Sequence, residues 1–301
     1  MLDDVFDRYQ FASQTAVDCL RIFRRHKSLL LFPLFSTAVC LLILLSLLAP
    51  EGFTQDAVLQ RSRELTLLVN SGDRGRIPAT ALALLLLILC LNSVILFFNA
   101  ALVHCYSLKT RGQSANPLRG LLAAARCLPG LVVWSLFSLT IGLCIRVTEM
   151  VFQRNDILAK YLLIRLSGVV WSVAVYFAVP MLVLERTGPL NALRNSVRLL
   201  ARIWGKQVSG YVGIGFFMLP AWLIGLALLG SLLSQDITAS QIGPLFPALG
   251  LVTVVMTGLI QSTLGSILQT ALYHFAAERY VPPGWRGSRL QHAFYVVNEL
   301  D

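Results

Sequence analysis

The sequence predicts an all-α polytopic membrane protein with six transmembrane helices in a single domain, and three observations support this fold class. Only 13% of the 301 residues are charged and the mean hydropathy is +0.71, whereas soluble domains carry about 25% charged residues. The apolar residues gather into long runs, and a run of roughly 20 apolar residues crosses the hydrocarbon core of a bilayer as a helix. Finally, the segments between these runs alternate between rich and poor in lysine and arginine.

Six apolar runs are long enough to be membrane spans. They cover approximately residues 28–49, 79–107, 129–152, 161–184, 208–234 and 245–275. The segment before the first run is 27 residues long and contains four aspartates, whereas the corresponding region of a secretory signal peptide is short and basic. The first run is therefore predicted to be a retained transmembrane helix.

The distribution of basic residues predicts the orientation of the spans. One set of segments contains 17 lysines and arginines and the alternate set contains seven. The basic set is 1–27, 108–127, 186–207 and the tail from residue 276, and the alternate set is 50–78, 146–160 and 235–243. Because cytoplasmic loops carry the excess of lysine and arginine, both termini are expected in the cytoplasm, with the protein in the bacterial inner membrane.

Three amphipathic helices are expected on the cytoplasmic side, at about residues 4–26, 116–130 and 188–210. The second and third place Pro117 and Pro189, 72 residues apart, at the first helical position, where proline is favoured. In the third, basic side chains follow one another at steps of four opposite an apolar row that includes Leu190, Leu193, Val197, Leu200 and Trp204. The predicted contacts to anionic lipid headgroups are Arg24, Arg25, Arg194, Arg198, Arg202 and Lys206.

Each amphipathic helix precedes two spans, so the chain is predicted to contain three repeats, 1–110, 111–187 and 188–280, and a short cytoplasmic tail, 281–301. Residues 98–111 align with 268–280 at an offset of 170, which matches Asn99 with Gln269 and His104 with His274. Two spans per unit would give the repeats parallel topology. Both histidines lie at span ends, where interfacial anchoring is the preferred interpretation over a proton relay or a metal pair.

Polar residues within spans are costly, so they are candidate functional residues. Those expected to line a helix interface or a water-filled cavity are Asn92, Asn99, Thr257, Gln261, Ser262 and Gln269. Packing is the simpler alternative, because small and polar side chains let membrane helices approach and hydrogen-bond. Arg146, Glu149 and Arg165 form a second candidate cluster on the external side, either a solvated group of ion pairs or a site for an anionic substrate.

The sequence contains none of the common motifs for metalloprotease, serine hydrolase, calcium or nucleotide sites. No catalytic residue, cofactor or metal site is therefore expected. The six cysteines include no C-x-x-C pair, so free thiols are expected. The net charge of +10 is explained by loops that flank membrane spans, and nucleic-acid binding is not expected.

Four blocks of sequence carry a resemblance to known membrane proteins. They are KSLLLFPLFS (27–36), FFNAALVHC (97–105), YFAVPMLVLERTGPLNALRNSVRLLARIWG (176–205) and LQTALYHFA (268–276). Their order and spacing resemble an uncharacterised bacterial family of six-span integral membrane proteins. More distantly, they are similar to the membrane domain found beside glycerophosphodiester phosphodiesterases. The resemblance implies a six-span fold and adds no catalytic residue.

Two functions remain open from the sequence. The first is a non-enzymatic scaffold or accessory subunit whose amphipathic helices contact anionic lipid, with a membrane-protein partner or a second copy of the chain. The second is a transporter or lipid-handling protein with a polar cavity lined by the second and sixth spans.

Overall fold

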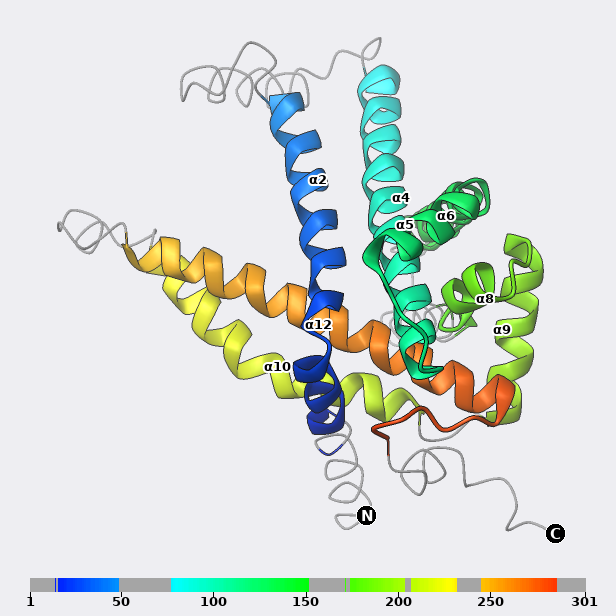
Figure 1. Cartoon of the computed structure of the whole chain (residues 1–301). Coiled ribbons are helices and arrows are strands. Elements are labelled where there is room, and N and C mark those ends of the chain that lie inside the picture. The colour runs from blue at the N-terminus through cyan, green and yellow to red at the C-terminus, as the bar shows by residue number, and fades with distance from the viewer. Residues whose placement is uncertain are drawn as a thin grey trace, which may run out of the picture.

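The computed structural model describes residues 14, 16–48, 77–151, 171, 174–203, 207–231 and 245–285, and every regular element within them is a helix (Figure 1). Residues 16–25, here called the N-terminal helix, come first. The elements that follow are η1 (Lys27–Leu30), α2 (Leu31–Leu48), α4 (Ile77–Thr110), α5 (Pro117–Arg126), α6 (Leu128–Val151), α8 (Ala178–Leu184), α9 (Pro189–Ile203), α10 (Gln207–Gly230) and α12 (Leu245–Glu278). The all-α fold class is confirmed.

Four stretches of helix are long and apolar enough to cross a membrane. They are Lys27–Leu47, Leu82–Thr110, Leu128–Val147 and Leu245–Glu278, and they coincide with the first, second, third and sixth predicted spans. Large apolar side chains on these helices are exposed, for example Leu42 at 61%. Such a surface is compatible with a protein that passes several times through a bilayer, because lipid chains solvate leucine as well as a protein core does.

The fourth and fifth predicted spans are described in part. Within 161–184, the described residues are Trp171 and 174–184, which include α8. Helix α10 occupies most of the fifth predicted span, but its apolar stretch in the described residues, Phe217–Gly230, is shorter than a span.

Helices α10 and α12 form a closely packed hairpin (Figure 1). A Cβ atom on Gly250 would lie 2.5 Å from the backbone nitrogen of Leu229 and 3.0 Å from the carbonyl oxygen of Gly225. A Cβ atom on Gly225 would in turn lie 2.9 Å from Cγ2 of Val254. The two backbones therefore approach to a distance that only glycine allows, as small residues do between membrane helices.

Figure 1 shows α2 and α4 side by side and the α10–α12 hairpin crossing beside them. The main buried cluster lies around this crossing and includes Tyr106 on α4, Phe177 before α8, and Leu268 on α12. The core therefore joins the end of α4 to the second half of α12, and the polar contacts described below lie there.

The short helices α5 and α9 begin where the sequence predicts. Pro117 occupies the first turn of α5, and the Asn116 side chain caps this helix by accepting a hydrogen bond from the Leu118 backbone amide at 3.2 Å. Asparagine is a favoured cap because its side-chain oxygen satisfies an amide that the helix leaves unpaired. Pro189 is the first residue of α9. Helix α5 packs on α4, and α9 packs on α8.

Candidate functional site

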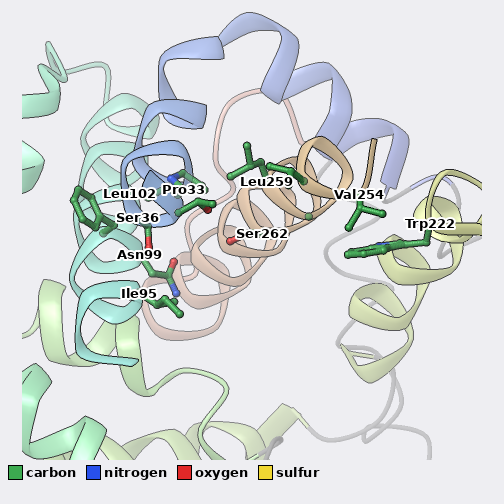
Figure 2. A pocket seen from close by; sticks show the side chains of 13 residues that line it. Pro33, Ser36, Ile95, Asn99, Leu102, Trp222, Val254, Leu259 and Ser262 are labelled. Atoms are coloured by element: carbon green, nitrogen blue, oxygen red, sulfur yellow. The ribbon is translucent and has the colours of Figure 1, made fainter. Parts of the chain in front are cut away.

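A pocket of about 380 Å³ lies between α2, α4, α10 and α12 (Figure 2). Its walls are mostly apolar and include Ile95, Leu102 and Leu259, together with the indole of Trp222. The polar lining groups are the side chains of Ser36, Thr37, Asn99 and Ser262. The pocket thus combines a large apolar surface with a few hydrogen-bonding groups on the helices that face it.

Asn99 is the polar group that connects the pocket to the packing of the helices. Its Oδ1 atom accepts a hydrogen bond from the Ser266 hydroxyl of α12 at 2.7 Å. The amide therefore borders the pocket and also ties α4 to α12. Asn99 is only partly buried, so packing alone would let its side chain rotate. The hydrogen bond to Ser266 fixes the orientation of the amide.

The other predicted polar residues make different contacts. The Asn92 amide donates to the Ser135 hydroxyl of α6 at 2.8 Å, and the Trp222 indole N–H donates to Gln261 Oε1 at 2.7 Å. The Gln269 amide donates to the carbonyl oxygen of Tyr176, and Thr257 is buried. The structure therefore brings Asn99 and Ser262 to one pocket. Asn92 and Gln261 each join two helices, whereas Gln269 joins α12 to the turn before α8. Asn99 and Gln269, matched in the predicted repeat, bond to different partners.

Three polar contacts join α4, or the residue that follows it, to α12 with a constant separation of 167 residues along the chain. The first is Asn99 with Ser266. The second is Ser107 with His274, whose Oγ and Nε2 atoms lie 2.9 Å apart. In the third, the Arg111 guanidinium donates to Glu278 Oε1 at 2.6 Å. Because the separation does not change, the two helices run in the same direction along this interface.

His274 is fully buried, so the prediction that it anchors at the membrane interface is wrong. Its Nδ1 atom lies 3.1 Å from Glu278 Oε2, one turn further along α12. Both ring nitrogens therefore have polar partners, which offsets the cost of burying the ring. Ser107, Arg111 and Glu278 were not among the residues predicted from the sequence. His274 and Glu278 are four residues apart, which places both on one helix face. This spacing was the sequence signal that could have indicated their contact.

Comparison with known proteins gives a family for this arrangement. A protein-family model described as "Family of unknown function (DUF6159)" matches residues 79–281, about two thirds of the chain. The chain belongs to this family. The DUF6159 match begins at α4 and ends just after α12, so all the α4–α12 contacts fall within it. No curated protein and no solved structure matches the chain. The resemblance to membrane domains beside glycerophosphodiester phosphodiesterases stays a prediction.

In this DUF6159 protein, α9 exposes apolar and basic side chains together. Leu190 is 68% exposed and Val197 is also exposed. Arg194 and Arg198 are exposed, and neither forms a hydrogen bond or an ion pair with another described residue. Arg202 belongs to α9 but its side chain lies outside the described residues, as does Lys206 altogether. The described part of the predicted basic row is therefore free to bind an external anion.

The buried face of α9 consists of small residues. Ala192 and Ser196 are fully buried, and the Ser196 hydroxyl donates to the carbonyl oxygen of Ala174 at 2.7 Å. Helix α5 repeats this arrangement 72 residues earlier, with Gly120 and Ala124 buried. Its Leu118 is 64% exposed, like Leu190 on α9. In both helices the fully buried contacts come from small residues, Leu121, Leu193 and Leu199 pack partly against the core, and Leu118 and Leu190 are exposed.

The remaining predicted residues lie apart from the pocket. Arg24 and Arg25 are exposed near the end of the N-terminal helix. Arg146 is exposed on α6, Glu149 belongs to α6 with its side chain outside the described residues, and Arg165 lies outside them entirely. In the part of the chain that the structure describes, no group of three or more His, Cys, Asp or Glu residues could hold a metal ion.

Proposed function

We propose that this DUF6159 protein is a non-enzymatic, multi-pass protein of the bacterial inner membrane that binds anionic lipid through α5 and α9 and serves as a scaffold or accessory subunit. The observation that carries the proposal is the outer face of α9, where exposed Leu190 and Val197 accompany the exposed Arg194 and Arg198, which have no partner among the described residues.

A bilayer surface satisfies both kinds of side chain on α9 at once. The apolar residues enter the boundary between headgroups and acyl chains, and the guanidinium groups meet lipid phosphates. Each basic residue near an anionic leaflet contributes about 1 kcal/mol of attraction. Two arginines on one described helix face therefore favour anionic over neutral lipid.

The topology that we propose has six spans in three parallel repeats, 1–110, 111–187 and 188–280, with both termini in the cytoplasm. Two observations support it. The buried pair Gly120 and Ala124 on α5 corresponds to Ala192 and Ser196 on α9 at the offset of 72. Helices α4 and α12, the second spans of the first and third proposed repeats, run in the same direction along their contact.

The lipid-binding part of the proposal is tested with nanodiscs that contain phosphatidylcholine alone or mixed with phosphatidylglycerol. Native mass spectrometry then counts the anionic lipids retained by the full chain. We expect Arg194→Gln with Arg198→Gln to weaken retention by about fivefold per charge. The charge-conserving double variant Arg194→Lys with Arg198→Lys is the control and should retain phosphatidylglycerol. Equal retention by the glutamine and wild-type proteins would reject lipid binding through α9.

The scaffold part is tested separately by chemical cross-linking in intact membranes followed by purification in mild detergent. A discrete complex, with another membrane protein or with a second copy, is expected. Recovery of monomer alone, under conditions that cross-link a known membrane complex in the same cells, would reject the scaffold role and leave lipid binding unaffected.

The pocket in Figure 2 supports a second candidate function, the handling of a lipid within the membrane. Its apolar walls suit an acyl chain, and Asn99 and Ser262 provide hydrogen-bonding groups for a more polar part of the molecule. Gly258 lines the pocket, and a Cβ atom there would be 3.8 Å from the Trp222 ring, so a side chain can enter without displacing the backbone.

We expect Gly258→Phe to fill the pocket and reduce the lipid that co-purifies with the protein. The control is Gly142→Phe on α6, where a Cβ atom would meet no atom within 4 Å. Lipid-to-protein ratios from extracts of both purified variants measure the effect. If Gly258→Phe retains as much lipid as Gly142→Phe, the pocket does not hold lipid.

A further inference from the structure

A second cavity, of about 250 Å³, lies where the N-terminal helix, the end of α4 and the chain after α12 meet. Its basic lining residues are Arg25, His26 and Lys109, and none of the described residues that line it is acidic. We infer that this cavity binds a phosphoryl group, carried either by a lipid headgroup or by a soluble phosphate. The site uses other helices than α5 and α9, so it stands independently of the proposed function.

Packing holds the walls of this cavity in place. The Trp285 indole N–H donates to the Tyr106 hydroxyl at 3.0 Å, and both side chains are buried. The Tyr280 hydroxyl donates to the carbonyl oxygen of Thr110 at 2.8 Å. These two contacts fasten residues 280–285 to the end of α4. Three segments that are distant in sequence therefore form the cavity, and hydrogen bonds between them keep its walls in place.

Gly284 closes one side of the cavity against the N-terminal helix. Its φ angle is +96°, a conformation that side-chain-bearing residues rarely adopt, and a Cβ atom there would lie 3.3 Å from Cγ1 of Ile22. The backbone thus approaches the wall that Ile22 and Arg25 provide. A larger residue would press against Ile22 and disturb this side of the cavity.

Among the described residues that line the cavity, no carboxylate neutralises the positive charges of Arg25 and Lys109. Glu278, the acidic residue of α12 near the end of α4, forms an ion pair with Arg111, whose guanidinium nitrogen lies 2.6 Å from Glu278 Oε1. Asp18 on the N-terminal helix forms an ion pair with Arg21 at 3.1 Å. The Lys109 ammonium donates to the Ser28 hydroxyl at 2.8 Å, which leaves two of its three N–H groups for a ligand.

These groups match a phosphoryl group in charge and geometry. A guanidinium fork and an ammonium group bind phosphate oxygens through charge-assisted hydrogen bonds, which are stronger than neutral ones. The cavity also lies at the end of the apolar stretch Leu82–Thr110. If α4 crosses the bilayer, this is the level of the lipid phosphates, where basic pockets between helices bind headgroups.

The test uses the purified full chain and two probes. In the first arm, inorganic phosphate is titrated by calorimetry into the protein in phosphatidylcholine nanodiscs at constant ionic strength. In the second arm, native mass spectrometry measures binding of added phosphatidylglycerol. The test variants are Arg25→Gln, Lys109→Gln and the double variant. Lys27→Gln is the matched control, because Lys27 is an exposed basic residue two positions after Arg25 and does not line the cavity.

We expect at least one probe to bind wild-type protein and to lose about tenfold in affinity with Arg25→Gln, which is the loss expected for one charge-assisted hydrogen bond. Lys27→Gln should bind as the wild type does. Loss confined to phosphatidylglycerol identifies a headgroup site, loss confined to phosphate identifies a soluble ligand, and loss in both arms shows that the phosphoryl group itself is recognised.

The inference is overturned if neither probe binds, or if the double variant binds both probes with wild-type affinity. Because loss of the Lys109–Ser28 hydrogen bond could itself unfold the protein, Lys109→Arg is included to retain the charge. Helix content by circular dichroism and the elution volume in detergent establish that each variant is folded. Arg25 is exposed, so Arg25→Gln gives a decisive result even if Lys109→Gln does not fold.

Discussion

His274 Nε2 lies 2.9 Å from Ser107 Oγ, across the interface between α12 and α4. The other ring nitrogen, Nδ1, lies 3.1 Å from Glu278 Oε2, and Glu278 also accepts from Arg111 at 2.6 Å. The imidazole is fully buried. A continuous chain of polar contacts therefore runs from Ser107 through His274 and Glu278 back to Arg111, the residue that follows α4. His274 is therefore part of the packing interface between α4 and α12.

Replacement of His274 by leucine should destabilise the protein. Loss of the ring leaves the buried Ser107 hydroxyl without its partner on α12, and an unsatisfied buried polar group costs about 1–3 kcal/mol. Thermal unfolding in detergent, followed by circular dichroism, should show a lower Tm for His274→Leu. His104→Leu is the matched control, because the buried Nδ1 of His104 has no hydrogen-bond partner among the described residues. An equal fall in Tm for both variants would contradict a specific role for the His274 contacts.

Gly120→Ala should weaken the packing of α5 on α4. The added Cβ atom would lie 2.5 Å from Cys105 Sγ and 2.7 Å from the carbonyl oxygen of Ala101. Overpacking of this kind costs about 1–3 kcal/mol. Because the carbonyl belongs to the α4 backbone, adding Cys105→Ala should not restore stability. The Tm of Gly120→Ala should fall, whereas Gly142→Ala, which meets no atom within 4 Å, should match or exceed the wild type.

Gly250→Ala should separate α10 from α12. Its Cβ atom would lie 2.5 Å from the Leu229 backbone nitrogen and 2.9 Å from the Leu228 carbonyl carbon, and neither can move without shifting α10. We expect faster proteolysis of the hairpin in detergent and a lower Tm. Gly230→Ala serves as the control, because a Cβ atom there meets nothing within 4 Å. If the two variants are cleaved equally fast, the close backbone contact does not hold the hairpin together.

The stability of the protein without anions should fall as the pH drops below about 6.5. Burial lowers the pKa of His26, and the positive charges of Lys109 and Arg25 lower it further. The unfolded chain, in which histidine has a pKa of about 6.5, therefore binds a proton more readily than the folded protein. The contribution of neutral His26 is complete above this pH and is lost as the pH falls toward the lower folded pKa.

Thermal unfolding in chloride between pH 8 and pH 5 measures this dependence, and His26→Gln should show a weaker one. Sulfate, which keeps both negative charges over this range, should bind in the Arg25–Lys109 cavity and oppose the loss, because a protonated His26 adds a third cation to the lining. A wild-type pH profile that His26→Gln leaves unchanged would show that another group is responsible.

Much of the helical framework was predictable, because membrane-length apolar runs are a local property of the chain. The run predicted at 79–107 is α4 (Ile77–Thr110), and the run at 245–275 is α12 (Leu245–Glu278). The starts of α5 and α9 were also predictable, since proline at the first turn is favoured by local backbone geometry. The polar residues Asn99 and Ser262 were recognised as candidates from the cost of burying polar groups in a span.

The partners of those polar groups could not be predicted. Asn99 bonds to Ser266 and borders the pocket, while Gln269 reaches the carbonyl oxygen of Tyr176. Periodicity shows that residues share a helix face, but it does not specify the rotation and translation of that helix against another. A shift of one turn would exchange every partner along the α4–α12 interface.

The sequence by itself determined where the long helices lie, which of their residues are polar, and that basic side chains gather between the apolar runs. These depend on neighbouring residues alone. Only the tertiary structure decided that His274 is buried against Ser107 and that Arg25 and Lys109 line one cavity. The same packing includes close contacts at Gly120, Gly250 and Trp285. Contacts of this kind set the relative positions of segments that are far apart in the sequence. Ser107 and His274, for example, are 167 residues apart.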